Sequence, residues 1–190
     1  MADVEESKVT LIVEDGSCVP DANCYVSLDF ADDYMRNTGK TAWDAKTEDE
    51  KKSYLINATK YIDRTYSKLG WKGQKKYHRR QNLCFPRVEL YDKDGDEVLG
   101  IPKELKEAVC EAGYLATSTS LFTVNSESGE IKRQKADALE IEYFSTSDSS
   151  GTYISRFSVL DSLLSDFYKT KTSGSRVKRA FHTDMLGGLI

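Results

Sequence analysis

The chain has 190 residues, with 27 Lys and Arg against 31 Asp and Glu, a formal net charge of -4 and a pI near 5.3. This length predicts one domain, and the acidic balance disfavours a protein whose main task is to hold phosphate backbones, while leaving room for a local basic patch. No apolar run approaches the roughly 18 residues of a membrane helix, and the acidic start MADVEESK lacks the order of a signal peptide. We therefore expect a protein that acts inside a cell, away from membranes.

The first part of the chain predicts a short strand and then a helix. Residues 8–13 form a β-branched run, and Glu14-Asp15-Gly16 after it is typical of a turn. Ser27 begins a helical pattern with Asp29 in its first turn, and Asn37-Thr38-Gly39 ends it.

A long second helix is predicted between residue 47 and Gly70. Thr47 and Glu50 have the spacing of a capping box, in which each side chain binds the backbone N–H of the other residue. Apolar residues then recur at three and four positions, which predicts one face packed against a core. These residues are Tyr54, Leu55, Ala58, Tyr61, Ile62, Thr65 and Leu69.

A basic stretch follows at residues 72–80, and an apolar segment re-enters the interior at residues 83–87. The acidic string at 92–97 resembles a calcium loop, but its glycine is three positions after the first Asp and the distal bidentate Glu is absent. Asp94-Gly95 between two apolar runs favours a hairpin turn instead.

The second half of the chain changes from helix to strand and back. Pro102 and the small apolar residues up to Ala116 predict a third helix. Residues 121–124, 130–134 and 139–144 are strand-like, with a turn at 126–129 between the first two. A last helix is expected from Ser158, as its N-cap, to Phe167.

The titratable residues indicate no catalytic or metal site. The four cysteines form no C-x-x-C pair, so we interpret them as reduced thiols, mostly small buried hydrophobes. His78 and His182 lie far apart, and the common nucleotide, zinc and hydrolase motifs are absent. We expect no catalytic residues, no metal and no cofactor, and a protein that is not an enzyme.

The C-terminal end has a different composition from the rest. Residues 170–175 are typical of a linker. Beyond them, basic and large apolar side chains have no periodic element to bury them, which indicates either a partner-docking tail or an end that is disordered or folded back. The candidate docking residues are Arg176, Lys178, Arg179, Phe181, Met185, Leu186, Leu189 and Ile190.

Together these patterns predict a mainly α fold. We expect a compact core of three to four helices at residues 1–170, with a β-hairpin or small antiparallel sheet as an arm at about 121–144. Residues 171–190 are expected to form a linker and an extended tail.

Several blocks resemble, in order and spacing, a family of tailed-bacteriophage head–tail connector proteins, also called adaptor or head-completion proteins. The resemblance covers roughly residues 13–116. The family is also often labelled as a primosomal, DnaT-like single-stranded-DNA-binding protein. The blocks are Val13-Glu14-Asp15-Gly16, Ala22-Asn23-Cys24-Tyr25-Val26-Ser27, Leu55-Ile56-Asn57-Ala58-Thr59-Lys60-Tyr61-Ile62-Asp63, Trp71-Lys72-Gly73, Leu83-Cys84-Phe85-Pro86-Arg87, Asp92-Lys93-Asp94-Gly95 and the segment from Ile101-Pro102 to Ala116.

The resemblance implies a structural connector without catalytic residues. The expected assembly is a ring of about a dozen copies that binds the portal protein and a tail or next neck protein and lets double-stranded DNA pass. Its location would be the neck of the virion, after assembly in the cytoplasm of the bacterial host. The overall acidity suits a channel to which DNA must not adhere.

The alternative is a single-stranded-DNA-binding protein that uses the basic stretch. Cations interleaved with an aromatic residue can follow a backbone and stack on a base. A run of cations beside an acidic body is more often a solvated loop or a salt-bridge partner between subunits. The candidate residues for DNA or for an inter-subunit contact are Lys75, Lys76, Tyr77, Arg79 and Arg80, with Lys72 beside them.

Overall fold

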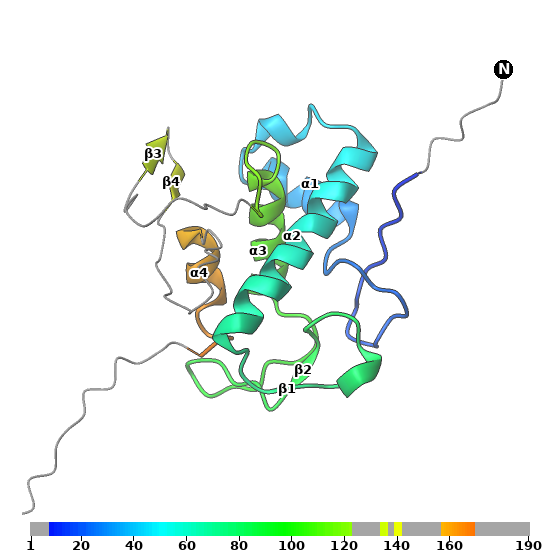
Figure 1. Cartoon of the computed structure of the whole chain (residues 1–190), viewed down its shortest axis with the longest axis vertical. Helices are drawn as coiled ribbons and strands as arrows, with labels where there is room; N and C mark the ends of the chain where they lie inside the picture. The colour runs from blue at the N-terminus through cyan, green and yellow to red at the C-terminus, as the bar shows by residue number, and fades with distance from the viewer. Residues whose placement is uncertain (1–7, 123–133, 137–138, 142–156, 170–190) are drawn as a thin grey trace, which may run out of the picture.

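The computed structural model describes residues 8–122, 134–136, 139–141 and 157–169 (Figure 1). This part of the chain is mainly α-helical, as expected. Its helices are α1 (Leu28–Asn37), α2 (Glu48–Leu69), α3 (Lys103–Leu115) and α4 (Ser158–Leu164), with the short 3-10 helices η1 (Thr41–Trp43) and η2 (His78–Arg80). Two small antiparallel sheets pair β1 (Gln74–Lys75) with β2 (Arg87–Val88), and β3 (Gln134–Ala136) with β4 (Leu139–Ile141).

Helix α2 is the central element, and its start is the predicted capping box. The Thr47 hydroxyl accepts from the backbone N–H of Glu50 at 3.3 Å, and the Glu50 carboxylate accepts from the Thr47 N–H at 2.8 Å. The helix packs on α3, which in turn packs on α4. A Cβ on Gly113 of α3 would lie 3.1 Å from the Leu55 side chain, so the absence of a side chain at Gly113 allows the two helices to approach closely.

The core is rich in aromatic side chains at the C-terminal end of α2. Trp71 lies edge-on to Phe85 with ring centroids 5.0 Å apart, and Tyr66 packs on Trp71 and Tyr168. Edge and tilted arrangements of this kind add to the free energy of burial. Within the described ranges, no helix is both long enough and apolar enough to cross a membrane.

The expected strand at residues 8–13 is wrong in extent. Only Val13 forms a bridge, to Cys24. The neighbouring backbone groups bind the Asn23 side chain instead, which accepts from the Ile12 N–H at 2.9 Å and donates to the Thr10 carbonyl at 3.0 Å. The Ile12 carbonyl also accepts from the backbone N–H groups of Asn23 and Cys24, so the run is held partly by the Asn23 side chain and partly by its backbone rather than by a full partner strand.

The hairpin turn at residues 92–97 is confirmed. Tyr91 and Glu97 form an antiparallel bridge, and the Val98 N–H donates to the Leu90 carbonyl at 2.8 Å. The Asp92 carboxylate accepts from the N–H groups of Asp94 and Asp96, both at 2.9 Å. The carboxylate therefore shapes the turn.

Two expected boundaries near the C-terminal end are corrected. Helix α4 starts one residue earlier than expected, with Phe157 rather than Ser158 as its N-cap, and ends at Leu164, short of Phe167. It ends early because the chain after it pairs with the segment that follows α2, through the bridge between Trp71 and Tyr168.

In the expected β arm, Leu121 lies in a turn, and strand β4 falls within the expected strand at 139–144 and pairs with β3. The expected turn at 126–129 lies outside the described residues. Strand β3 overlaps the expected strand at 130–134 only at Gln134. The expected linker and tail from residue 171 onward lie outside the described residues.

Gly73 provides a test of how tightly β1 and β2 are joined. Its φ is +64°, and a Cβ there would collide with the Val88 carbonyl oxygen. We expect Gly73→Ala to lower the free energy of unfolding by about 2–4 kcal/mol, from backbone strain plus displacement of β2. Urea denaturation measures this change.

Gly39 is the matched control because its φ is also positive, at +71°, and no atom lies within 4 Å of a Cβ built there. Gly39→Ala is expected to cost only the backbone strain, about 1–2 kcal/mol. Equal losses for the two variants would contradict the steric role of Gly73.

Candidate nucleic-acid interface

The predicted basic residues are brought together in one loop that contains β1 and η2. Lys76, Arg79 and Arg80 are exposed to solvent. Lys75 is half-buried, and its Nζ donates to the Gln81 carbonyl at 3.4 Å. Three of the four cations are therefore available to a ligand, whereas Lys75 stabilises the loop through a hydrogen bond within it.

Tyr77 also anchors the loop. Its ring is half-buried, its hydroxyl donates to the Gly16 carbonyl at 3.4 Å, and its backbone N–H donates to Oε1 of the buried Gln81 at 3.3 Å. The Lys76 Nζ lies 5.3 Å from the centroid of the Tyr77 ring. These contacts hold η2 in place, and they occupy part of the aromatic surface that the sequence offered for stacking.

Arg87 fixes the base of the loop, a role that the sequence did not reveal. Its Nε donates to the Lys72 carbonyl at 2.6 Å, and its two terminal nitrogens donate to the carbonyls of Gly73 at 2.7 Å and Cys84 at 3.1 Å. Burial lowers the pKa of this guanidinium. Because its donors are engaged by three carbonyls inside the protein, Arg87 organises the loop and is not a candidate for DNA contact.

A hydrogen-bonded cluster beneath the loop joins three distant parts of the chain. The Tyr25 hydroxyl donates to the Asp63 carboxyl group at 2.8 Å and accepts from the N–H groups of Cys84 at 2.9 Å and Phe85 at 3.1 Å. The Cys84 N–H also reaches Asp63, at 2.9 Å. Burial raises the pKa of Tyr25, of Asp63 and of the Cys84 thiol. A thiol shifted in this direction is a poor nucleophile at neutral pH.

The loop belongs to a strongly basic window of an acidic protein. Ten of the chain's 27 Lys and Arg residues lie between Lys51 and Arg80, and the only acid in that window is Asp63. Within the described part of the chain, Lys76, Arg79 and Arg80 form no ion pair with a carboxylate. Their charges therefore face solvent without a direct ion-pair partner among the described residues, and an exposed group of cations of this kind can attract phosphates.

Helix α2 carries further cations, which were not among the predicted site residues because its pattern was interpreted only for packing. Lys60, Arg64 and Lys68 are exposed and spaced four residues apart. That spacing places them on one side of the helix, and it was visible in the sequence.

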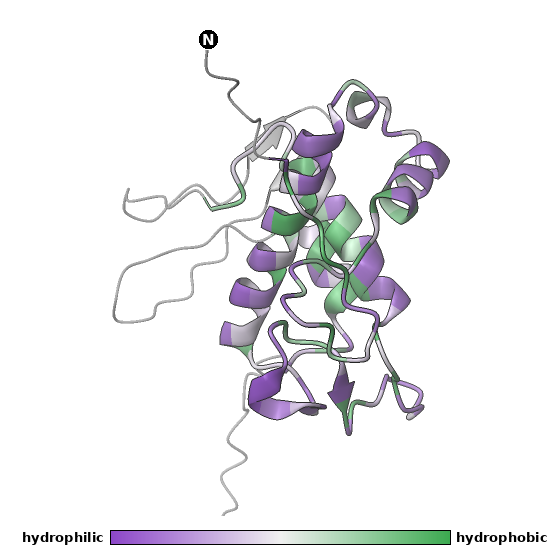
Figure 2. Ribbon diagram, turned by 90° about the vertical axis from the view of Figure 1, so that its right-hand side faces the viewer, coloured by the Kyte–Doolittle hydropathy of each residue, from purple (hydrophilic) through white to green (hydrophobic). Residues whose placement is uncertain are grey.

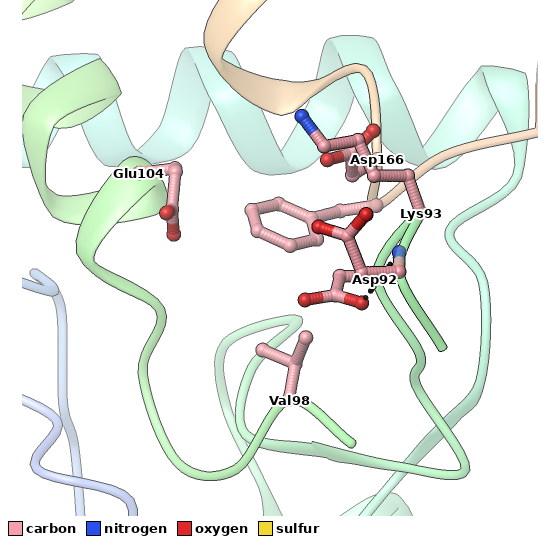
Figure 3. A pocket seen from close by; sticks show the side chains of 7 residues that line it. Asp92, Lys93, Val98, Glu104 and Asp166 are labelled. Atoms are coloured by element: carbon pink, nitrogen blue, oxygen red, sulfur yellow. Dashed lines mark hydrogen bonds between the residues drawn. The ribbon is translucent and has the colours of Figure 1, made fainter. Parts of the chain in front are cut away.

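A second concave region has the opposite charge. A hollow of about 260 Å³ is lined by Asp92, Lys93, Asp94, Val98, Glu104, Asp166 and Phe167 (Figure 3). Four carboxylates against one lysine disfavour a phosphate ligand. Across the described ranges, no group of three or more His, Cys, Asp and Glu side chains is placed to hold a metal ion. The hollow is therefore not a competing site for nucleic acid.

Comparison with known proteins identifies a family. A sequence model of the family described as "Putative DnaT-like ssDNA binding protein" matches residues 9–180. Neither a curated protein nor a solved structure matches the chain.

This match overturns the expected head–tail connector, which was wrong, and favours the DNA-binding alternative. The blocks that carried the resemblance include Tyr25, Asp63 and Arg87, whose contacts hold the fold together. Residues that specify a fold do not by themselves specify a function. The candidate tail residues from Arg176 to Ile190 lie outside the described residues, and the expected ring, portal contact and virion location remain untested.

The Tyr25 hydroxyl can be removed without removing the ring. We expect Tyr25→Phe to lower the free energy of unfolding by about 1–3 kcal/mol, because the Phe85 N–H and one oxygen of Asp63 lose their partner inside the protein. Urea denaturation measures this decrease.

The control is Tyr91→Phe. This side chain is 51% exposed, and its hydroxyl has no partner among the described residues. It should change the free energy of unfolding by less than about 0.5 kcal/mol. Two equal changes would show that the Tyr25 cluster does not stabilise the fold.

Proposed function

The chain belongs to the family described as "Putative DnaT-like ssDNA binding protein", and from this premise we propose that it binds single-stranded DNA through the exposed cations of the β1–η2 loop. The observation that carries the proposal is the arrangement of Lys76, Arg79 and Arg80. They face solvent from a loop that is fixed to the core on both sides, and no carboxylate among the described residues pairs with them.

The fixed loop favours binding because its conformation is already set before DNA binds. Lys75, Tyr77 and Gln81 hold the loop through hydrogen bonds, and Arg87 holds its base. A surface that is already in its binding conformation loses less conformational entropy on association.

The chemistry of these side chains supports backbone recognition that is independent of sequence. Each arginine presents a planar fork of donors that matches two phosphate oxygens, and the lysine acts as a mobile point charge. Contacts to phosphates position a strand without reading its bases. The affinity should therefore depend strongly on salt and weakly on base sequence.

The test is a titration of a fluorescent oligothymidylate followed by anisotropy at several salt concentrations. The variant carries Lys76→Gln, Arg79→Gln and Arg80→Gln together. We expect weaker binding and a shallower salt dependence, with the slope of log K against log salt reduced by about 0.7 for each phosphate that the variant no longer binds.

A matched control removes three exposed positive charges from acidic surroundings, through Arg36→Gln, Lys93→Gln and Lys103→Gln. Arg36 pairs with Asp33 at 2.8 Å, Lys103 pairs with Glu107 at 3.4 Å, and Lys93 lines the acidic hollow. The control has the same net charge as the loop variant and should keep most of the affinity. Absence of salt-dependent binding by the unaltered protein would refute the proposed function.

A further inference from the structure

We infer that the interface extends beyond the loop along the solvent face of α2, where Lys60, Arg64 and Lys68 hold the backbone of the same single strand and Phe122 stacks on one of its bases. This inference rests on the proposed function. It assigns to α2 a binding face, and to Phe122 the role of a stacking platform.

The cations of α2 form a regular row. They are exposed, whereas Leu55, Ile62 and Tyr66 on the other side of the helix are buried. Figure 2 shows this division as hydrophilic residues along the edge of α2 that faces away from the other helices. Four residues advance an α-helix by about 6 Å, so neighbouring cations in the row can meet different phosphates of an extended strand.

No acidic residue interrupts the row. Asp63 is the only acid between Lys51 and Arg80, and its two carboxyl oxygens bind Tyr25 and Cys84 on the side of the helix that faces the loop. Among the described residues, no ion pair involves Lys60, Arg64 or Lys68. The charge of this face is therefore complementary to a polyanion over two turns of helix.

Phe122 provides an exposed aromatic ring, whereas the Tyr77 ring of the loop is half-buried. It is 37% exposed, a high value for a phenylalanine. The ring packs edge-on against Tyr61 with centroids 5.9 Å apart, and the Arg64 guanidinium lies 5.9 Å from its centroid. An exposed ring beside a guanidinium suits a strand with unpaired bases, because the ring can stack on a base while the guanidinium binds the adjacent phosphate.

Residues 167–169 lie between the cations of α2 and the basic loop. Lys169 is exposed, and its N–H donates to the Gly70 carbonyl at 2.9 Å, directly after α2. The Lys72 N–H donates to the Phe167 carbonyl at 2.8 Å. Figure 1 shows this segment passing the C-terminal end of α2, on the side of the molecule that holds β1 and β2. Cations of α2, of the last segment and of the loop thus lie along a continuous part of the fold.

The experiment compares three triple variants in the anisotropy titration: the α2 variant Lys60→Gln, Arg64→Gln and Lys68→Gln, the loop variant, and the acidic-surroundings control. All have the same net charge. The α2 variant is expected to bind more weakly than the control, with the slope of log K against log salt reduced by about 2. Thermal unfolding of each variant shows whether its fold is retained.

Stacking is tested separately with Phe122→Leu and with the conservative Phe122→Tyr. The leucine variant should bind oligothymidylate about 5- to 150-fold more weakly, whereas the tyrosine variant should keep its affinity. On an abasic strand of the same length, the leucine variant and the unaltered protein should bind equally, because no base is present to stack. A general loss of stability would weaken binding to both strands equally, so the difference between the two strands reports the stacking alone.

The outcomes separate the inference from the proposed function. If the loop variant loses affinity while the α2 variant matches the control, the loop binds DNA and the α2 interface is refuted. If Phe122→Leu weakens binding to the abasic strand as much as to oligothymidylate, the stacking role is refuted. If the unaltered protein binds no single-stranded DNA, both the proposed function and this inference fail.

Discussion

The hydroxyl group of Tyr25 is the point on which the rest of the structure depends. It donates to Asp63 on α2 and accepts from the backbone of Cys84 and Phe85, so one atom connects the N-terminal segment, the central helix and the segment after the loop. Burial raises the pKa of this phenol, because the charged form loses its hydration inside the protein. The group therefore remains a hydrogen-bond donor, and the three segments keep a fixed arrangement.

This fixed arrangement of the three segments also positions the basic loop on the surface. Once residues 83–87 are held against α2, the Arg87 guanidinium reaches the carbonyls of Lys72 and Gly73, and β1 pairs with β2. In the loop between them, Lys76 and the two arginines of η2 lie in solvent. The same cluster keeps the carboxyl group of Asp63 away from these cations, so it does not neutralise them. The hydrogen bonds of Tyr25 and Asp63 thus both fix the fold and leave the charges of the loop exposed.

Local signals in the sequence predicted the helices, and long-range contacts explain what it did not predict. Ser27 and the pair Thr47 and Glu50 mark helix starts through neighbours three residues away, so their effect is readable without the fold. The run at 8–13 is held by the Asn23 side chain, 11 positions beyond Ile12, and the clamp of Arg87 depends on residues up to 15 positions away. The charges of the basic stretch are adjacent in the sequence and therefore indicate a site by themselves, whereas the cations of α2 stand four residues apart within a pattern that indicates packing.

The net charge of -4 averages over charges that do not act together, so it does not by itself exclude the proposed binding of DNA at one part of the surface. At physiological salt, the field of an exposed charge is screened within about 8 Å, so a bound strand responds to the groups next to it rather than to the total. The acids around the hollow near Asp92 and Glu104 lower the total, while the cations of α2 and η2 determine the local potential. In the part of the chain that the structure describes, this separation of charges favours binding of a polyanion at the basic face, since the acidic surface around the hollow repels it. The composition that argued against DNA binding is therefore consistent with binding that is confined to one side.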